Sequence, residues 1–230
     1  MSAHSKAFVT TAMLLGLVSF YSPVEAGCKD AAAPEVDWKG CSKQLVQLDG
    51  SDLAGANLEG AFLSGTSFKD AKLTKANLQM SELVRTSFDG ADLAGANFEK
   101  ALASRAKFKS ASLKGARLMK AEFQRVDFEG ADLSGANIEE GELLRNSFVN
   151  ANLSGADFTG ATLPRTIFKG ANLSGATFKR AYLYWARFEG TDLTQVKDLT
   201  QPQLDMACGD EHTKLPEGLT APANWPCGED

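Results

Sequence analysis

The stretch SDLAG ANLEG AFLSG TSFKD, residues 51–70, opens a pattern that continues without a gap to ARFEG at residues 186–190. The unit is five residues long. Its third position is Leu, Phe or Ile, with Ala103 as the one exception, and its first position is most often Ala. A period of five fits neither a strand, which repeats every two residues, nor a helix, which repeats every 3.6. The chain must therefore turn by a fixed angle at every unit, with the first and third positions facing inward.

A longer period of twenty residues lies on top of the first. Phe occupies the third position of every fourth unit, and Leu occupies that position in the unit that follows. These positions are Phe68, Phe88, Phe108, Phe128, Phe148, Phe168 and Phe188, and Leu53, Leu73, Leu93, Leu113, Leu133, Leu153, Leu173 and Leu193. Four units therefore complete one coil, and successive coils are expected to pair as in-register parallel strands about 4.8 Å apart. The sequence predicts a Phe ladder and a Leu ladder on neighbouring walls of a rod.

The fourth and fifth positions of the unit have the composition of a turn. Gly is frequent at the fifth position, as in Gly55 and Gly95, and Pro164 stands at a fourth position. A type II turn favours Pro at its second residue and requires a positive φ at its third, which Gly adopts most easily. These two positions are therefore predicted to form the corners.

The units beginning ADL at residues 91–93 and 131–133, and ANL at 151–153, carry the motif A(D/N)LXX as written. On these residues the chain resembles the pentapeptide-repeat family, and the resemblance covers residues 46 to about 195. It implies an all-β fold, a right-handed quadrilateral β-helix with four pentapeptides per coil.

The mature chain is predicted to have three parts, a β-helix over residues 48–195 between an N-terminal cap over 27–47 and a C-terminal cap over 196–230. Caps are needed because a stack of coils exposes unpaired backbone at both ends. In the C-terminal cap, Thr200 to Gln203 predicts a short helix that runs to about Ala207, with Thr200 as N-cap and Gln203 completing a capping box. Trp38 and Trp225 are expected to cover the two ends of the core.

The first 26 residues are typical of a signal peptide. Lys6 is the only charge before an apolar run over residues 7–20, and Val24-Glu25-Ala26 follows. The run is shorter than the roughly 20 apolar residues that a membrane-spanning helix needs. We therefore expect residues 1–26 to be removed and the mature protein to be exported, periplasmic or secreted, without a membrane span. Acylation of Cys28 is the alternative, which Glu25 disfavours because an apolar residue is expected at that place.

The four cysteines lie outside the repeat, with Cys28 and Cys41 before it and Cys208 and Cys227 after it. An even number of cysteines in an exported chain suggests disulfides. The ends of a seven-coil rod are about 35 Å apart, whereas a disulfide needs Cα atoms within about 7 Å. The predicted pairs are therefore Cys28–Cys41 and Cys208–Cys227. Free cysteines or a metal site are the alternatives, but His212 is the only histidine of the mature chain, which disfavours zinc.

One column of outward positions carries a run of like charges. The fifth position on the third wall reads Gly65, Arg85, Arg105, Arg125, Arg145, Arg165 and Trp185. Like charges at the same position of neighbouring coils repel each other, and a corner does not require arginine. Because guanidinium groups suit phosphate and carboxylate, the five arginines are a candidate anion-binding site. The alternatives are neutralisation by glutamates of the same units, and duplication of an arginine without a role. These glutamates are Glu82, Glu122 and Glu142.

Three aromatic residues, Tyr182, Tyr184 and Trp185, take outward positions in the last coil beside this column. An exposed aromatic cluster can contact a sugar or a partner. The C-terminal segment must lie nearby, however, so we expect it to fold back over the cluster.

No catalytic site and no cofactor are predicted. The repeat contains neither His nor Cys, and its glycines follow the repeat rather than a phosphate-binding loop. The net charge of −5 is mild and argues against nonspecific nucleic-acid binding. The sequence therefore predicts a non-enzymatic exported scaffold or binding surface for an anionic cell-envelope ligand or a protein, with no nucleic acid. The family resemblance implies the alternative, a DNA-mimicking, topoisomerase-binding protein of the quinolone-resistance type, which the signal, mild charge and arginines oppose.

Overall fold

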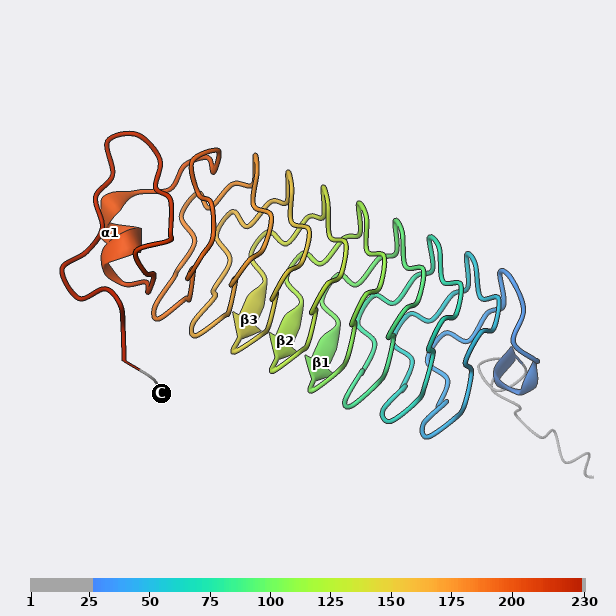
Figure 1. The fold of residues 1–230 in the computed structure, drawn as a ribbon. Helices are drawn as coiled ribbons and strands as arrows, with labels where there is room; N and C mark the ends of the chain where they lie inside the picture. The colour runs from blue at the N-terminus through green and yellow to red at the C-terminus, as the bar shows by residue number, and fades with distance from the viewer. Residues whose placement is uncertain (1–26, 229–230) are drawn as a thin grey trace, which may run out of the picture.

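The computed structural model describes residues 27–228, which form a stack of coils with a cap at each end (Figure 1). Residues at the second position of the unit pair in parallel with residues twenty positions further on, from Asp37 with Asn57 to Thr177 with Lys197. The chain therefore advances by one coil every twenty residues, which is the period that the Phe and Leu positions predict. The segment 1–26, predicted as a signal peptide, lies outside the described residues.

Most coils are joined by single bridges, because each wall is short between corners. On one wall, three units pair over three residues each and form strands. These are β1 (Leu102–Ser104), β2 (Glu122–Gln124) and β3 (Glu142–Leu144), which pair in parallel in that order. They lie in adjacent coils (Figure 1). The 3-10 helix η2 (Gly27–Lys29) stands at the N-terminal end and helix α1 (Gln201–Asp205) at the C-terminal end.

The core is the predicted ladder of inward side chains. Successive Phe rings from Phe68 to Phe188 stack with centroids 4.8–5.4 Å apart and planes within 19° of parallel. First-position alanines such as Ala96 and Ala136 are also buried, because small side chains fill the space that the large ones leave. Where the first position is Thr166, its hydroxyl donates a hydrogen bond to the Leu143 carbonyl at 2.6 Å, so this buried hydroxyl is satisfied.

The corners have the backbone that the turn residues predict. At one of them the N–H of Ala56 donates to the carbonyl of Leu53 at 3.0 Å, and Gly55 has a φ of 69°. A positive φ at the third residue of the turn is the condition that glycine satisfies without strain. Many other residues take the same conformation, including the five arginines of the predicted column, whose φ values are 54–56°.

The coil geometry begins earlier than predicted. Asp37 already pairs with Asn57, and Ser42 with Phe62, so residues 36–47 belong to the coils rather than to a cap over 27–47. Trp38 occupies a third position there and is buried. In the next unit Lys43 stands where an apolar residue is expected. Its ammonium lies 3.9 Å from the centroid of the Trp38 ring, and burial lowers its pKa.

Both caps are closed by the predicted disulfides. Cys28 is bonded to Cys41 and Cys208 to Cys227, with Cα atoms 5.4 and 5.5 Å apart. In each bond, one cysteine belongs to a short terminal segment and the other to the coil stack. The cysteines of the stack, Cys41 and Cys208, are buried. The two ends of the core are therefore covalently covered.

Helix α1 covers the last coil with two buried side chains, Gln203 and Leu204. It begins after Thr200, as predicted, and ends at Asp205, two residues before the predicted end. The N–H of Thr200 donates to Oε1 of Gln203 at 2.9 Å, which is half of the predicted capping box. Nε2 of Gln203 then donates to the carbonyls of Phe178 and Ala181, both at 2.8 Å. Backbone groups that would be orphaned at the end of the stack are thus satisfied.

The rest of the C-terminal segment packs on the same end. The indole N–H of Trp225 donates to the Ala207 carbonyl at 2.8 Å, and its ring lies against Gly209, which leaves no room for a Cβ there.

Asp192, in the last coil, is also bonded to the C-terminal segment. Hydrogen bonds from Thr194 and then from the Lys214 ammonium lower the pKa of Asp192 to about 2. Within residues 27–228, no helix has the length and apolar character to cross a membrane.

Replacing Phe128 by Ala tests the inward ladder. The Phe128 ring stacks between Phe108 and Phe148, at 5.0 and 4.8 Å. Neighbouring coils are held at a fixed spacing by their hydrogen bonds and cannot close the space, so we expect the free energy of unfolding in urea to fall by about 3–5 kcal/mol. The control is Phe62→Ala, an outward ring that is 45% exposed, for which a change below about 0.5 kcal/mol is expected. Equal losses in the two variants would show that the ring assignment is wrong.

Candidate functional site

One wall of the rod differs from the others and contains β1, β2 and β3. We call it wall three; its units are residues 41–45, 61–65, 81–85, 101–105, 121–125, 141–145, 161–165 and 181–185. Its last corner carries the predicted arginine column, which we call the arginine corner: Arg85, Arg105, Arg125, Arg145 and Arg165. The structure brings these residues into one row because the coils stack in register.

An open groove of about 650 Å³ runs along the arginine corner, and we call it the corner groove. It is lined by Ser104, Arg105, Gln124, Arg125, Leu144, Arg145, Pro164, Arg165 and Tyr184. Four of the five predicted arginines therefore share one concave surface with a predicted aromatic residue. Arg85 stands on the same corner, one coil before the groove begins.

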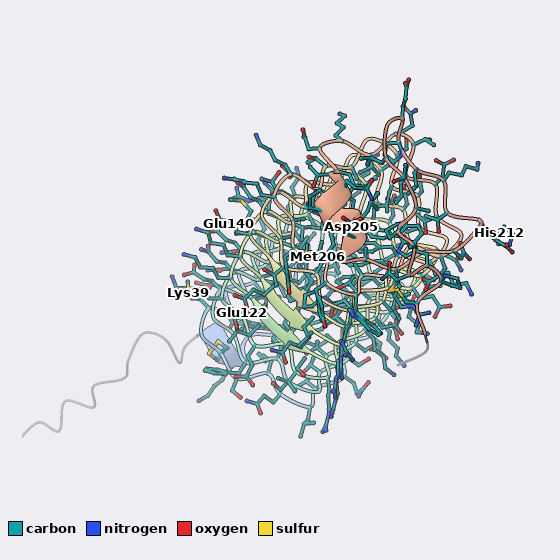
Figure 2. The ribbon with its side chains drawn as sticks, turned by 90° about the vertical axis from the view of Figure 1, so that its left-hand side faces the viewer. Lys39, Glu122, Glu140, Asp205, Met206 and His212 are labelled. Atoms are coloured by element: carbon teal, nitrogen blue, oxygen red, sulfur yellow. A yellow bond between two sulfur atoms is a disulfide. The ribbon has the colours of Figure 1, made fainter. Side chains whose placement is uncertain are left out.

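The nearby glutamates do not neutralise the arginine corner by direct pairing. Across residues 27–228, Arg85, Arg105, Arg125 and Arg145 make no ion pair. Glu82 instead accepts a hydrogen bond from the hydroxyl of Ser64 at 2.9 Å. Glu122 and Glu142 are register partners on β2 and β3, so they lie over each other rather than against the arginines. Glu122 is one of the outward side chains labelled in Figure 2.

Charged columns elsewhere on the rod are paired from rung to rung. Lys109 meets Glu129 at 2.7 Å, and Arg117 meets Glu99 at 3.2 Å. Lys72 meets Asp52 in the same way, at 3.2 Å. Exposed pairs of this kind add little stability, but they remove the repulsion between like charges. Within residues 27–228, Arg85, Arg105, Arg125 and Arg145 lack this compensation, and their positive potential is open to solvent.

The backbone adds a second cost at these positions. Each corner arginine has a positive φ, a conformation that costs an L-residue about 1 kcal/mol or more relative to glycine. Gly65, one coil before Arg85 in the same column, adopts it without that cost. Lysine and asparagine occur at other corners, so the strain alone does not single out arginine. The unbroken run of five arginines on one column does. Four of them, Arg85, Arg105, Arg125 and Arg145, make no ion pair within residues 27–228.

The aromatic cluster is only partly covered. The rings of Tyr182 and Tyr184 are stacked, with centroids 6.2 Å apart and planes 8° from parallel, and both side chains are exposed. The backbone N–H of Trp185 donates to the Met206 carbonyl at 2.7 Å, so the C-terminal segment is bonded to the cluster at this residue. The expectation that the segment covers the whole cluster is therefore wrong for the tyrosines. The guanidinium of Arg165 lies 5.5 Å from the centroid of the Trp185 ring.

A second groove of about 340 Å³ lies between the last coil and the C-terminal cap, and we call it the cap groove. Its lining comprises Tyr184, Trp185, Asp205, Met206, Ala207, Cys208, Asn224, Cys227 and Gly228. Figure 2 shows Asp205 and Met206 at the end of α1 that contributes to it. Sequence reasoning missed this groove, because three segments far apart in the chain form it and none has a local pattern.

Exposed apolar side chains also gather on wall three. Among the described residues, the large exposed apolar side chains on this wall are Leu45, Phe62, Leu102, Leu144, Tyr182 and Tyr184, and the one remaining, Met80, stands at the preceding corner. The sequence contains the signal for this: Phe62, Leu102 and Leu144 occupy second or fourth positions, which point outward. Aromatic and aliphatic groups beside arginine are typical of binding surfaces.

The sequence model of the family described as pentapeptide repeats matches in 8 copies, over residues 51–90, 86–125, 104–140, 127–165 and 161–195. The chain belongs to the pentapeptide-repeat family, whose members fold as right-handed β-helices. The family is generally one of structural or binding proteins rather than enzymes. No group of three or more His, Cys, Asp or Glu able to hold a metal occurs in the described part of the chain.

Solved structures of the same family are similar in fold. A trypsin-treated form of QnrB1, described as a plasmid-mediated fluoroquinolone resistance protein, aligns with a TM-score of 0.60 at 20% identity, over 76% of this chain and 92% of that one. HetL from Nostoc sp. strain PCC 7120, described as involved in heterocyst differentiation regulation, aligns with a TM-score of 0.46 at 22% identity, over 84% and 87%. The alignment with QnrB1, at 20% identity, shows the fold alone. No curated protein has a matching sequence.

The variants Arg125→Gly and Arg125→Ala separate the backbone cost from the side chain. Gly accepts the φ of 54° at this corner, so we expect Arg125→Gly to raise the free energy of unfolding by roughly 0.5–1 kcal/mol. Arg125→Ala keeps the strain and should change stability little. Both free energies are measured by urea unfolding. A glycine variant less stable than the alanine variant would contradict the assigned strain.

Proposed function

We propose that the protein is an exported, non-enzymatic, four-sided rod that binds a linear anionic ligand along the arginine corner. The observation that carries this proposal is the row of five arginines on one corner, four of which line the corner groove. Of the five, Arg85, Arg105, Arg125 and Arg145 have no ion-pair partner within residues 27–228. Each guanidinium offers a planar pair of donors to a carboxylate or phosphate.

The spacing of the row favours a chain of charges over a single small anion. Neighbouring rungs are about 4.8 Å apart, so five arginines span about 20 Å. A small anion would meet one or two of them, and an exposed pair of this kind is worth little by itself. A polymer with repeated charges meets several at once, and each contact raises the effective concentration of the next.

Export is supported by the ends of the chain. Both caps are closed by disulfides, which persist in oxidising compartments and are rare in the cytosol. Residues 7–20 form the apolar run expected of a signal peptide. A periplasmic or secreted protein would meet its anionic ligand at the cell envelope, for which a rigid rod with one basic corner is suited.

The similarity of fold to QnrB1 raises the topoisomerase-binding alternative, in which the rod imitates DNA. A DNA mimic must present a row of negative charges, whereas the most continuous charged row here is positive. Fold similarity by itself does not carry function. We therefore keep the anionic ligand as the proposed function, with no nucleic acid as its partner.

The test uses inorganic polyphosphate, a linear anion without rings, and the triple variant R105Q/R125Q/R145Q. We expect the wild-type protein to bind it with an affinity that falls steeply with salt, and the variant to bind roughly tenfold more weakly or worse. Isothermal titration calorimetry measures both.

The matched control is K75Q/K100Q/R180Q. These residues stand at the same position of the unit, with φ values of 57–58°, but on other columns. The control removes the same net charge, so it should bind polyphosphate nearly as the wild type does. Equal weakening in the two triple variants would mean that only net charge matters and would overturn the proposal.

A further inference from the structure

We propose that the ligand of the arginine corner is a linear acidic polysaccharide, a chain of uronic-acid units, whose end enters the cap groove beside Tyr184. This inference rests on the proposed function and deepens it. It assigns the carboxylates of the sugar chain to the corner groove, and the ring and hydroxyls of its terminal unit to the cap groove.

The two grooves form one path. Tyr184 lines both of them, with its exposed ring at the junction. Arg165 lines the corner groove, and its guanidinium lies 5.5 Å from the ring of Trp185, which lines the cap groove. A chain that pairs with the arginines therefore reaches aromatic rings when it is extended toward the C-terminal cap.

The rung spacing selects among linear polyanions. Acidic side chains on one face of an extended peptide recur every two residues, about 6.8 Å, and the phosphates of a nucleic-acid strand recur about every 3.4 Å along the axis. Neither matches rungs about 4.8 Å apart. A polyuronate carries one carboxylate on each pyranose unit, and rotation about its glycosidic bonds can turn these carboxylates toward the row of arginines. An acidic helix, with a pitch of about 5.4 Å, approaches the rung spacing, and the cap groove is what favours the polyuronate over it.

The cap groove has the composition of a sugar subsite. Aromatic rings stack on the apolar face of a pyranose, while planar polar side chains accept and donate hydrogen bonds to its hydroxyls. Here Tyr184 and Trp185 provide rings, and Asp205 and Asn224 provide polar groups. The side chains of Tyr184, Trp185 and Asn224 make no hydrogen bond to any residue in the range 27–228. They can therefore bond to a ligand without breaking an internal contact.

Asp205 gives the path a direction. One of its oxygens accepts a hydrogen bond from Nε2 of Gln201 at 2.9 Å, which leaves the other oxygen directed to solvent. A carboxylate disfavours a second carboxylate beside it but accepts hydrogen bonds from sugar hydroxyls. The terminal unit is thus oriented with its hydroxyls toward Asp205 and its own carboxylate away from Asp205, on the side of the corner groove.

The experiment compares three polymers on the full mature protein: oligogalacturonate, its fully methyl-esterified form, and inorganic polyphosphate. The ester keeps the sugar and removes the charge, and polyphosphate keeps the charge and removes the sugar. The variants are Tyr184→Ala and, as a matched control, Phe62→Ala, an exposed ring on wall three outside both grooves. Affinities are measured by calorimetry, and the tryptophan fluorescence reports contact at Trp185.

We expect oligogalacturonate to bind the wild-type protein. Its ester should bind at least tenfold more weakly, because the charge-assisted hydrogen bonds are lost. Tyr184→Ala should weaken the binding of oligogalacturonate roughly fivefold. Phe62→Ala should have no effect, and Tyr184→Ala should weaken polyphosphate binding clearly less than it weakens oligogalacturonate binding. The last result distinguishes a sugar contact from general damage to the site.

Two results would overturn the inference in distinguishable ways. If polyphosphate binds through the arginines while oligogalacturonate binds no better than its ester, or is insensitive to Tyr184→Ala, the sugar assignment fails and the proposed function stands. If neither anionic polymer binds, both fail. A synthetic acidic helical peptide that binds more tightly than oligogalacturonate would assign the corner to a protein and would also overturn the inference.

Discussion

The parallel pairing of each residue with the one twenty positions further on sets every other feature of this molecule. It holds the coils at a constant spacing and places like side chains over like. Inside the rod, that register turns isolated Phe residues into a continuous stack of rings. Outside, it turns each position of the five-residue unit into a column. A surface of this kind can be altered one column at a time, because the core and the corners are built from other positions.

In-register stacking also has a cost, since any charge that recurs at one position is placed next to itself. Most columns avoid the cost by alternating in sign or by pairing with a neighbour, as Lys109 does with Glu129. Within residues 27–228, Arg85, Arg105, Arg125 and Arg145 do neither. All five residues of the arginine corner adopt a backbone that glycine would take more easily. Repulsion and strain oppose folding here, and the buried ladder of the same coils offsets them. Charge repulsion and backbone strain are both unfavourable in the free protein. A site for an external anion would have this combination, because a bound anion relieves the repulsion.

Much of the fold could be predicted because the code is local and repeats. The five-residue unit specifies corners and inward positions, the Phe period specifies the coil, and the rod's length determines which cysteines can meet. The start of the coils at Val36 could not be predicted, since Lys43 replaces an apolar residue and is accommodated by its contact with Trp38. The arginine row was readable in the sequence. The lack of ion pairs at Arg85, Arg105, Arg125 and Arg145 within residues 27–228 depends on where Glu122 and Glu142 point. The cap groove was not readable, because it exists only where the last coil, α1 and the terminal disulfide meet.

The central claim is that the arginine corner, rather than the total charge of the protein, binds an external anion. Side-chain Nε–H signals in a nitrogen-15 NMR spectrum can report each arginine separately during a titration with polyphosphate. The account predicts that Arg85, Arg105, Arg125, Arg145 and Arg165 shift together and saturate together, while Arg117, which is paired with Glu99, and Arg180, on another column, stay in place. Shifts of similar size at all of these arginines, or none at the five, would contradict it.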